Sequence, residues 1–122
     1  MPDTSLLETF ESPSESCFLI EHVNEEFTSV CPVTGHPDFG TILLRYEPSE
    51  KCIELKSLKL YYQSYRNEGI FYEAVTNQIR DDLAQCLSPI WMQIKTSWKG
   101  RGGIHSTILA THGNVPQCWQ GE

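Results

Sequence analysis

The spacing of apolar residues changes twice along this chain, and the change limits the folds open to it. Residues 39–48 alternate between apolar and polar, as a strand with one buried face does. From residue 54 to residue 87 the apolar residues recur every three or four positions, which is typical of helices. Alternation then returns over residues 91–113. Locally joined strands before and after two helices predict an α+β domain: a four-stranded antiparallel sheet with both helices on one face.

Prolines, glycines and polar turns mark where the predicted elements end. An apolar strand at 17–23 comes first, and a second extended piece at 25–32 ends at its proline. The first helix is broken at residues 67–69, and the second is stopped by Ser88-Pro89. The second helix is expected to bury a stripe of five apolar residues: Phe71, Val75, Ile79, Leu83 and Leu87. The later strands are predicted at 91–98 and 104–113.

Length and charge restrict the class of protein. The 122 residues suit one domain, which we expect at 17–113, between a mobile acidic segment at 1–16 and a loose tail at 114–122. The net charge of −7 argues against direct nucleic-acid binding. The chain has neither an apolar run long enough to span a membrane nor the charged and apolar parts of a signal peptide. These features predict a cytoplasmic location.

The positive charge is concentrated in one helix and one turn. No Lys or Arg precedes Arg45, whereas Lys56, Lys59 and Arg66 recur at helical spacing. A later turn contains Arg101-Gly102, and glycines let backbone N–H groups approach an anion. This combination suits the phosphate groups of a cofactor. A helix face that is merely solvated is the alternative.

Cys31 lies where an extended piece ends, before a proline and a Thr-Gly turn, and functional residues are frequent in such loops. The local context fits a packed structural cysteine equally well. A carboxylate does not favour a thiolate by its charge, but Asp38 could carry a proton to the group that a Cys31 thiolate attacks. Residues 34–37 are few enough to bring Asp38 back toward Cys31. A turn or helix-cap role is the alternative for Asp38.

Phe71-Tyr72-Glu73 opens the second predicted helix. An aromatic ring can stack on a guanine-like base while a carboxylate accepts from its N–H and amino groups. The alternative is a core Phe71 with Glu73 placed favourably at the start of the helix dipole. The four histidines have no metal-binding spacing, and the five cysteines form no CxxC pair. We therefore predict no metal site.

Four motifs in this order resemble those of the NADPH-dependent nitrile reductases that act on 7-cyano-7-deazaguanine (preQ0) in queuosine biosynthesis. ELKSLKLY (54–61) fits all eight positions of the family's signature helix, and CPVTGHPDF (31–39) resembles its catalytic segment. NEGIFYEAVTN (67–77) and GRGG (100–103) come where its later motifs come. The resemblance runs from about residue 27 to residue 113 and points to the short, single-domain type.

The resemblance implies the tunnelling fold (T-fold), whose subunits assemble into rings, here a decamer of two stacked pentamers with active sites between subunits. It implies that Cys31 attacks the nitrile carbon to form a covalent thioimide, that Asp38 donates protons, and that two NADPH supply hydride to give the amine preQ1. Glu73 and the backbone at 53–55 would hold the deazaguanine. The implied substrate-binding residues are Ile53, Glu54, Leu55, Phe71, Tyr72 and Glu73, and the implied cofactor-binding residues are Lys56, Lys59, Arg101 and Gly102.

Two positions depart from the family pattern. The family usually has His-Glu where this chain has Tyr72-Glu73, and a tyrosine with a reference pKa of about 10 carries protons poorly near neutral pH. In some relatives a cysteine just after that glutamate pairs with the nucleophile as an oxidative guard. Here Ala74 and Val75 follow, so Cys52 or Cys86 would have to take that part if close in space.

Three alternatives on the same fold remain open from the sequence. An amidinotransferase-like relative would capture a nitrile on Cys31 and add ammonia, but intact Lys56 and Lys59 argue against it. A pterin-type enzyme needs a metal, against which the histidine spacing argues. A non-catalytic purine-binding ring module would keep the purine site without turnover.

Overall fold

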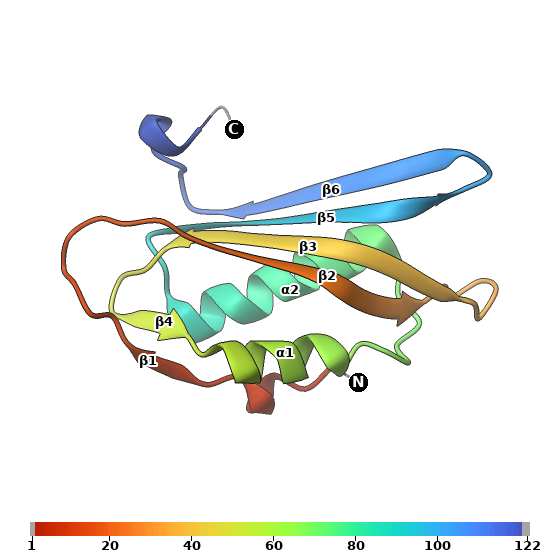
Figure 1. The fold of residues 1–122 in the computed structure, drawn as a ribbon, viewed down its shortest axis with the longest axis horizontal. Helices are drawn as coiled ribbons and strands as arrows, with labels where there is room; N and C mark the ends of the chain where they lie inside the picture. The colour runs from red at the N-terminus through yellow and green to blue at the C-terminus, as the bar shows by residue number, and fades with distance from the viewer. Residues whose placement is uncertain (1, 121–122) are drawn as a thin grey trace.

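The computed structural model describes residues 2–120, except the side chain of Arg101. Its main sheet is antiparallel and four-stranded, in the order β2-β3-β5-β6. These strands are β2 (Ile20–Val30), β3 (Pro37–Glu47), β5 (Trp91–Arg101) and β6 (Ile104–His112). Figure 1 shows α1 (Leu55–Gln63) and α2 (Tyr72–Leu87) on one face of this sheet. The α+β architecture predicted from the change of period is confirmed.

The two extended pieces predicted at 17–23 and 25–32 form one long strand. The pairing of β2 with β3 shifts register between Asn24 and Phe27, so a bulge separates the two runs of apolar residues. Beyond the bulge Phe27 and Ser29 face the core, and both are buried. Because the strand continues to Val30, it delivers the following Cys31 to one end of the sheet.

Part of the segment 1–16 has regular structure that the pattern of residues did not predict. A 3₁₀ helix, η1 (Thr4–Leu6), precedes β1 (Thr9–Glu11), and β1 pairs antiparallel with β4 (Lys51–Ile53). Leu7 packs against the core, although most of the segment is exposed. In the tail, a second 3₁₀ helix, η2 (Gln117–Trp119), lets Arg45 Nη2 donate to the Trp119 carbonyl oxygen at 2.9 Å. The mobility of both segments, and the domain limits, stay predictions.

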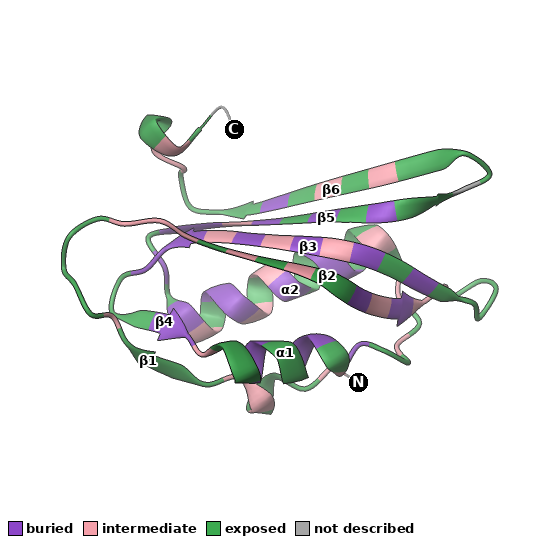
Figure 2. Ribbon diagram, viewed as in Figure 1, coloured by how far each residue is buried: buried purple, intermediate pink, exposed green. Residues whose placement is uncertain are grey.

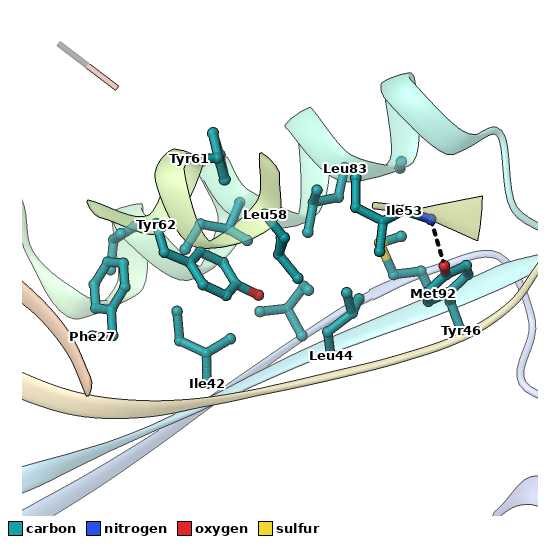
Figure 3. Close-up of a cluster of buried hydrophobic side chains, with 14 of the residues drawn as sticks. Phe27, Ile42, Leu44, Tyr46, Ile53, Leu58, Tyr61, Tyr62, Leu83 and Met92 are labelled. Carbon is teal, nitrogen blue, oxygen red and sulfur yellow. Dashed lines mark hydrogen bonds between the residues drawn. The ribbon is translucent and has the colours of Figure 1, made fainter. Parts of the chain in front are cut away.

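The core lies between the helices and the sheet. Burial alternates along β3, so Ile42, Leu44 and Tyr46 point toward the helices while the residues between them are half-buried (Figure 2). Figure 3 shows these side chains meeting Leu58 of α1 and Leu83 of α2. A buried phenol closes this end of the core, because the Ile53 N–H donates to the Tyr46 hydroxyl at 2.9 Å. This side-chain layer packs both helices against the sheet.

Helix boundaries follow local chemistry. Glu54 begins α1, and its two carboxylate oxygens accept from the N–H groups of Lys56 and Ser57, both at 2.8 Å. Ser88 ends α2 in the left-handed region with φ of 45°, directly before a proline. Within residues 2–120 no helix is both long and apolar enough to cross a membrane.

Candidate active site

Cys31 and Asp38 lie at the two sides of the tight connection between β2 and β3. The Cys31 N–H donates to the His36 carbonyl oxygen and the Gly35 N–H donates to the Cys31 carbonyl oxygen, both at 2.8 Å. Gly35 takes a φ of +76°, which a glycine adopts without strain. Asp38 sits inside β3, paired with Ser29, rather than in a turn or at a helix cap. The connection therefore holds Cys31 beside β3, the strand that contains Asp38.

The start of α2 is fastened to the same place. The Val30 N–H donates to the Glu68 carbonyl oxygen at 2.9 Å, and the Ile70 N–H donates back to the Val30 carbonyl oxygen at 3.1 Å. This short parallel bridge ties residues 68–70 to the end of β2. Phe71 and Tyr72 follow directly, so the predicted purine-binding motif opens beside the predicted nucleophile.

These segments border an open cavity of about 180 Å³. It is lined by Cys31, Pro32, Asp38, Ile70, Phe71, Tyr72 and Glu73. Phe71 is 56 % exposed, so its expected place in the buried stripe of α2 is wrong, whereas the other four members of the stripe are buried. An exposed ring at the rim of the cavity is free to stack on a planar ligand.

Asp38 is buried but held by polar contacts. Its residue is only 6 % exposed, and the Tyr72 hydroxyl donates to its Oδ1 at 3.2 Å. Thr28 Oγ1 donates to the Asp38 carbonyl oxygen at 2.7 Å, which fixes the backbone of β3 at this point. A buried carboxyl group that faces a cavity and lies near a thiol can deliver a proton to a molecule bound there.

The other predicted substrate-binding residues lie at the opposite end of the sheet. Ile53, Glu54 and Leu55 line a separate cavity of about 390 Å³, together with Ile20 at the start of β2. Cys31 follows the other end of β2, so roughly 30 Å of strand separates the two cavities. The bonds from the Lys56 and Ser57 N–H groups lower the pKa of the Glu54 carboxyl group. Because of the distance between the two cavities, a single purine cannot contact both Cys31 and residues 53–55 of the same chain.

The predicted cofactor-binding lysines are exposed on α1. Lys59 and Arg66 line a hollow of about 120 Å³ between α1 and β2, and Lys56 is exposed one turn before Lys59. Gly102 lies in the β5–β6 turn with φ of +59°, and the side chain of Arg101 lies outside the described residues. Lys56 and Lys59 lie one turn apart on α1, whereas Arg66 follows the end of that helix at Gln63, which comes earlier than the break predicted at 67–69. Exposed cations gathered in this way fit the phosphate groups of a dinucleotide.

None of the five cysteines forms a disulfide. Cys52 lies in β4, and Cys86 lies in the last turn of α2, whose first turn borders Cys31. The length of α2 puts Cys86 about 20 Å from that first turn, so it cannot guard Cys31 within one chain. Among residues 2–120, no group of three or more His, Cys, Asp or Glu side chains could hold a metal ion.

One contact at the site was not predicted from the sequence. The Tyr72 ring stacks on the ring of Trp98 from β5, with centroids 4.2 Å apart and planes 7° apart. Gly40 of β3 pairs with Trp98, and a Cβ there would lie 2.7 Å from Trp98 Cε3. A glycine within a strand often marks such a close approach, so Gly40 was the available signal.

Comparison with known proteins agrees with this geometry. Residues 37–117 match the family model described as QueF-like protein. An NADPH-dependent 7-cyano-7-deazaguanine reductase of Chloroherpeton thalassium is 58% identical over 88% of this chain and 93% of its own. Relatives with the same name in Anaeromyxobacter sp. strain K and Prosthecochloris aestuarii are each 54% identical, over 90% and 93% of this chain and 91% and 97% of their own.

A solved structure of the archaeosine synthase QueF-Like in the apo form superposes with a TM-score of 0.72 at 20% identity, covering 84% of this chain and 99% of that one. At this identity the likeness establishes the fold alone, which is the predicted tunnelling fold. The family-model match and the three relatives establish more than the fold. This chain belongs to the QueF-like protein family, among relatives named as NADPH-dependent 7-cyano-7-deazaguanine reductases.

Proposed function

We propose that this protein reduces the nitrile preQ0 to the amine preQ1 with two NADPH, in queuosine biosynthesis. One observation carries the proposal: a thiol and a buried carboxyl group, Cys31 and Asp38, line one cavity with an exposed aromatic ring and a carboxylate. The thiol is a nucleophile, the carboxyl group is a proton donor, and the ring and carboxylate can read a purine. The reaction requires that Cys31 be a free thiol rather than part of a disulfide. Because the cytoplasm keeps thiols reduced, a cytoplasmic location is part of this proposal.

The chemistry starts on Cys31. Its sulfur attacks as a thiolate and forms a bond to the nitrile carbon, one C≡N electron pair moves to nitrogen, and Asp38 delivers a proton to that nitrogen. The proton given up by the thiol restores the carboxyl group of Asp38. The product is a thioimide whose C=N bond accepts hydride, which NADPH supplies twice when bound. After the first reduction the C–S bond breaks, the electron pair returns to sulfur, and the free imine is reduced in turn. Asp38 is placed to supply protons to nitrogen throughout.

Purine recognition is assigned to the rim of the cavity. Phe71 stacks on the deazaguanine, and Glu73 in the first turn of α2 accepts from its ring N–H and amino groups. Tyr72 borders the same space. A cavity of about 180 Å³ is small against the roughly 300–1,000 Å³ of typical ligand sites. It therefore serves as half of a site, which a second subunit completes with the backbone at 53–55.

The phosphate groups of NADPH are assigned to Lys56 and Lys59 of α1, with Arg101 and Gly102 of the later turn. The exposure of both lysines on one helix face supports this assignment, since ammonium groups there can reach an anion without losing a buried partner. Arg66 lines the hollow beside Lys59, together with Glu26 of β2, and adds a further positive charge there. In this assignment the phosphate groups of NADPH bind mainly to α1.

A ring of subunits would bring the two half-sites together. Both edges of the main sheet, β2 and β6, expose apolar side chains, with Val23 at 61 % and Leu109 at 58 % exposure. Edge strands with apolar residues are poorly suited to water and pair readily with another copy. We assign the protein to a homo-oligomer, a decamer of two stacked pentamers, with active sites between subunits.

The test is to mix the protein with preQ0, with and without NADPH. Without NADPH we expect a new thioimide absorbance and a mass adduct on Cys31, and with NADPH we expect cofactor oxidation and preQ1. Cys31→Ala should form no adduct and oxidise no NADPH, whereas Cys86→Ala, a matched loss of a thiol elsewhere, should behave as wild type. An adduct that persists in Cys31→Ala would contradict the assignment of the nucleophile.

The same mixture separates the alternatives. Adduct formation without NADPH oxidation, and with an amidine product when ammonia is present, would favour the amidinotransferase-like reaction. Binding of preQ0 with neither adduct nor turnover would favour a non-catalytic purine-binding module. Each of these results would contradict the reductase.

A further inference from the structure

Trp98 stacks on the ring of Tyr72, which lines the active-site cavity. The two rings are parallel to within 7° at 4.2 Å, and Trp98 itself is only 3 % exposed. The edge of Phe27 meets the indole at 5.9 Å and 80°, so the indole is packed into the core as well. Trp98 does not line the cavity that holds Cys31 and Asp38. Tyr72, on which Trp98 stacks, does line that cavity.

A buried chain of hydrogen bonds ties Trp98 to the backbone of Tyr72. Trp98 Nε1 donates to Thr96 Oγ1 at 2.8 Å, the hydroxyls of Thr96 and Thr76 are 2.6 Å apart, and Thr76 Oγ1 donates to the Tyr72 carbonyl oxygen at 2.8 Å. The single proton of Thr76 is used at that carbonyl, so Thr96 must donate to Thr76. All donors in the chain therefore point toward Tyr72.

The stacked rings and the series of hydrogen bonds connect Trp98 to Tyr72 at two places. Trp98 contacts the Tyr72 ring directly and its backbone through two threonines that are fully buried. In such a buried series each donor has only one acceptor. The side chains are therefore held rigidly, because rotating any of them would leave a donor without a partner. The Tyr72 hydroxyl at the end of the ring is then aimed at Asp38 Oδ1, 3.2 Å away. Gly40, two residues from Asp38 on the same face of β3, leaves the space that the indole occupies.

We propose that Trp98 is a positioning residue that acts through Tyr72 to orient the carboxyl group of Asp38 toward the nitrogen it protonates. The inference rests on the proposed function, because it assigns a purpose to the geometry around that proton donor. Proton transfer depends steeply on alignment, and misplacement by about 1 Å can cost on the order of a hundredfold in rate. Thr96 and Thr76 share the role by fixing the indole.

The experiment measures the rate constant of thioimide formation with preQ0 in the absence of NADPH. Trp98→Leu, which removes both ring and donor, should slow adduct formation at least tenfold, while Trp98→Phe and Thr96→Val should give smaller losses. The Kd for preQ0, measured in a Cys31→Ala background, should change little. The matched control is Trp91→Leu, which removes another buried tryptophan of β5 whose Nε1 donates to Glu47 and should leave the adduct rate near wild type.

A double-variant cycle separates positioning from general damage. If Trp98 acts through the Tyr72 hydroxyl, Trp98→Phe should cause little further loss in a Tyr72→Phe background. Full additivity of the two losses, or an unchanged adduct rate in folded Trp98→Leu, would overturn the inference while leaving the reductase in place. A wild-type protein that forms no adduct at all would overturn both. Far-UV circular dichroism and Tm identify any variant that fails to fold, and the Trp98→Phe cycle then decides.

Discussion

Tyr72 makes two contacts of kinds that a histidine can also make, a ring stack and a hydrogen bond to Asp38. Its ring stacks on Trp98, which an imidazole can also do, and its hydroxyl donates to Asp38. A histidine with a reference pKa of about 6.5 exchanges protons near neutral pH, whereas tyrosine at about 10 does not. We therefore expect Tyr72→His to reduce preQ0 at an equal or higher rate near pH 7. Steady-state NADPH oxidation between about pH 6 and 9 measures this, since an imidazole adds its own titration to the profile.

The control at this position is Tyr72→Phe, which keeps the ring and removes the hydroxyl. Its rate should fall below that of wild type at every pH, because Asp38 loses a hydrogen-bond donor. A clear loss of activity in Tyr72→His, equal to that in Tyr72→Phe, would mean that the phenol has a role of its own that an imidazole cannot replace.

At the residue scale, the order of the four motifs along the chain predicts roles for single residues that their local surroundings alone do not. Cys31 and Asp38 taken separately fit a core thiol and a turn carboxylate, and only their shared cavity joins them. Phe71 was assigned to a buried stripe by its helical spacing, but α2 begins one residue later, so its ring is left at the rim. Trp98 escaped prediction because its contact with Tyr72 depends on sheet register, which no local pattern encodes.

The N-terminus of α1 depends on one carboxylate. Backbone N–H donors to Glu54 lower the pKa of its carboxyl group below the usual value, so folding favours the ionised form. This stabilisation is present above the unfolded pKa of about 4.3 and is lost as the pH falls through the lower folded value. Glu54→Gln should therefore lower Tm at pH 7, with the difference from wild type shrinking below about pH 4. Thermal unfolding across this range measures it.

A matched control for the cap is Glu50→Gln, which removes an exposed carboxylate in the bend before β4. Its Tm should track that of wild type, and its difference from wild type should not vary with pH as that of the cap variant does. An equal pH dependence in both variants would contradict a specific role for Glu54 in starting α1.

Elements were predicted where the pattern is long and missed where it is short. The α2 stripe spans several turns, and its end at Ser88-Pro89 is local chemistry, so both were found. The strands β1 and β4 have three residues each and pair across about 40 positions of sequence. Three residues are too few to show alternation, and their pairing is decided by tertiary packing. The bulge in β2 interrupts the strand, so the sequence predicts two extended pieces where the structure has one strand.

At the scale of the whole molecule, the two groups of proposed substrate-binding residues lie far apart within one chain. Residues 53–55 and Cys31 lie at opposite ends of β2, and helical packing against one face leaves both sheet edges open. The edge strands expose Val23 and Leu109, which a neighbouring copy could cover. The proposed ring, closed through these edges, would account for both observations, because it would place the end of one sheet beside the end of another.

Subunit complementation tests this arrangement directly. Cys31→Ala removes the nucleophile, and Leu55→Arg, at an exposed position, blocks the other half-site without disturbing the core. Each variant alone should be inactive. Co-assembled in equal amounts, the two should regain about a quarter of wild-type activity, because a site between subunits receives both intact halves by chance in about one case in four. A site contained in one chain would give none, since no chain in the mixture has both halves intact. Native mass spectrometry of the mixture, showing hybrid oligomers of the expected composition, ensures that a lack of activity is not a lack of mixing.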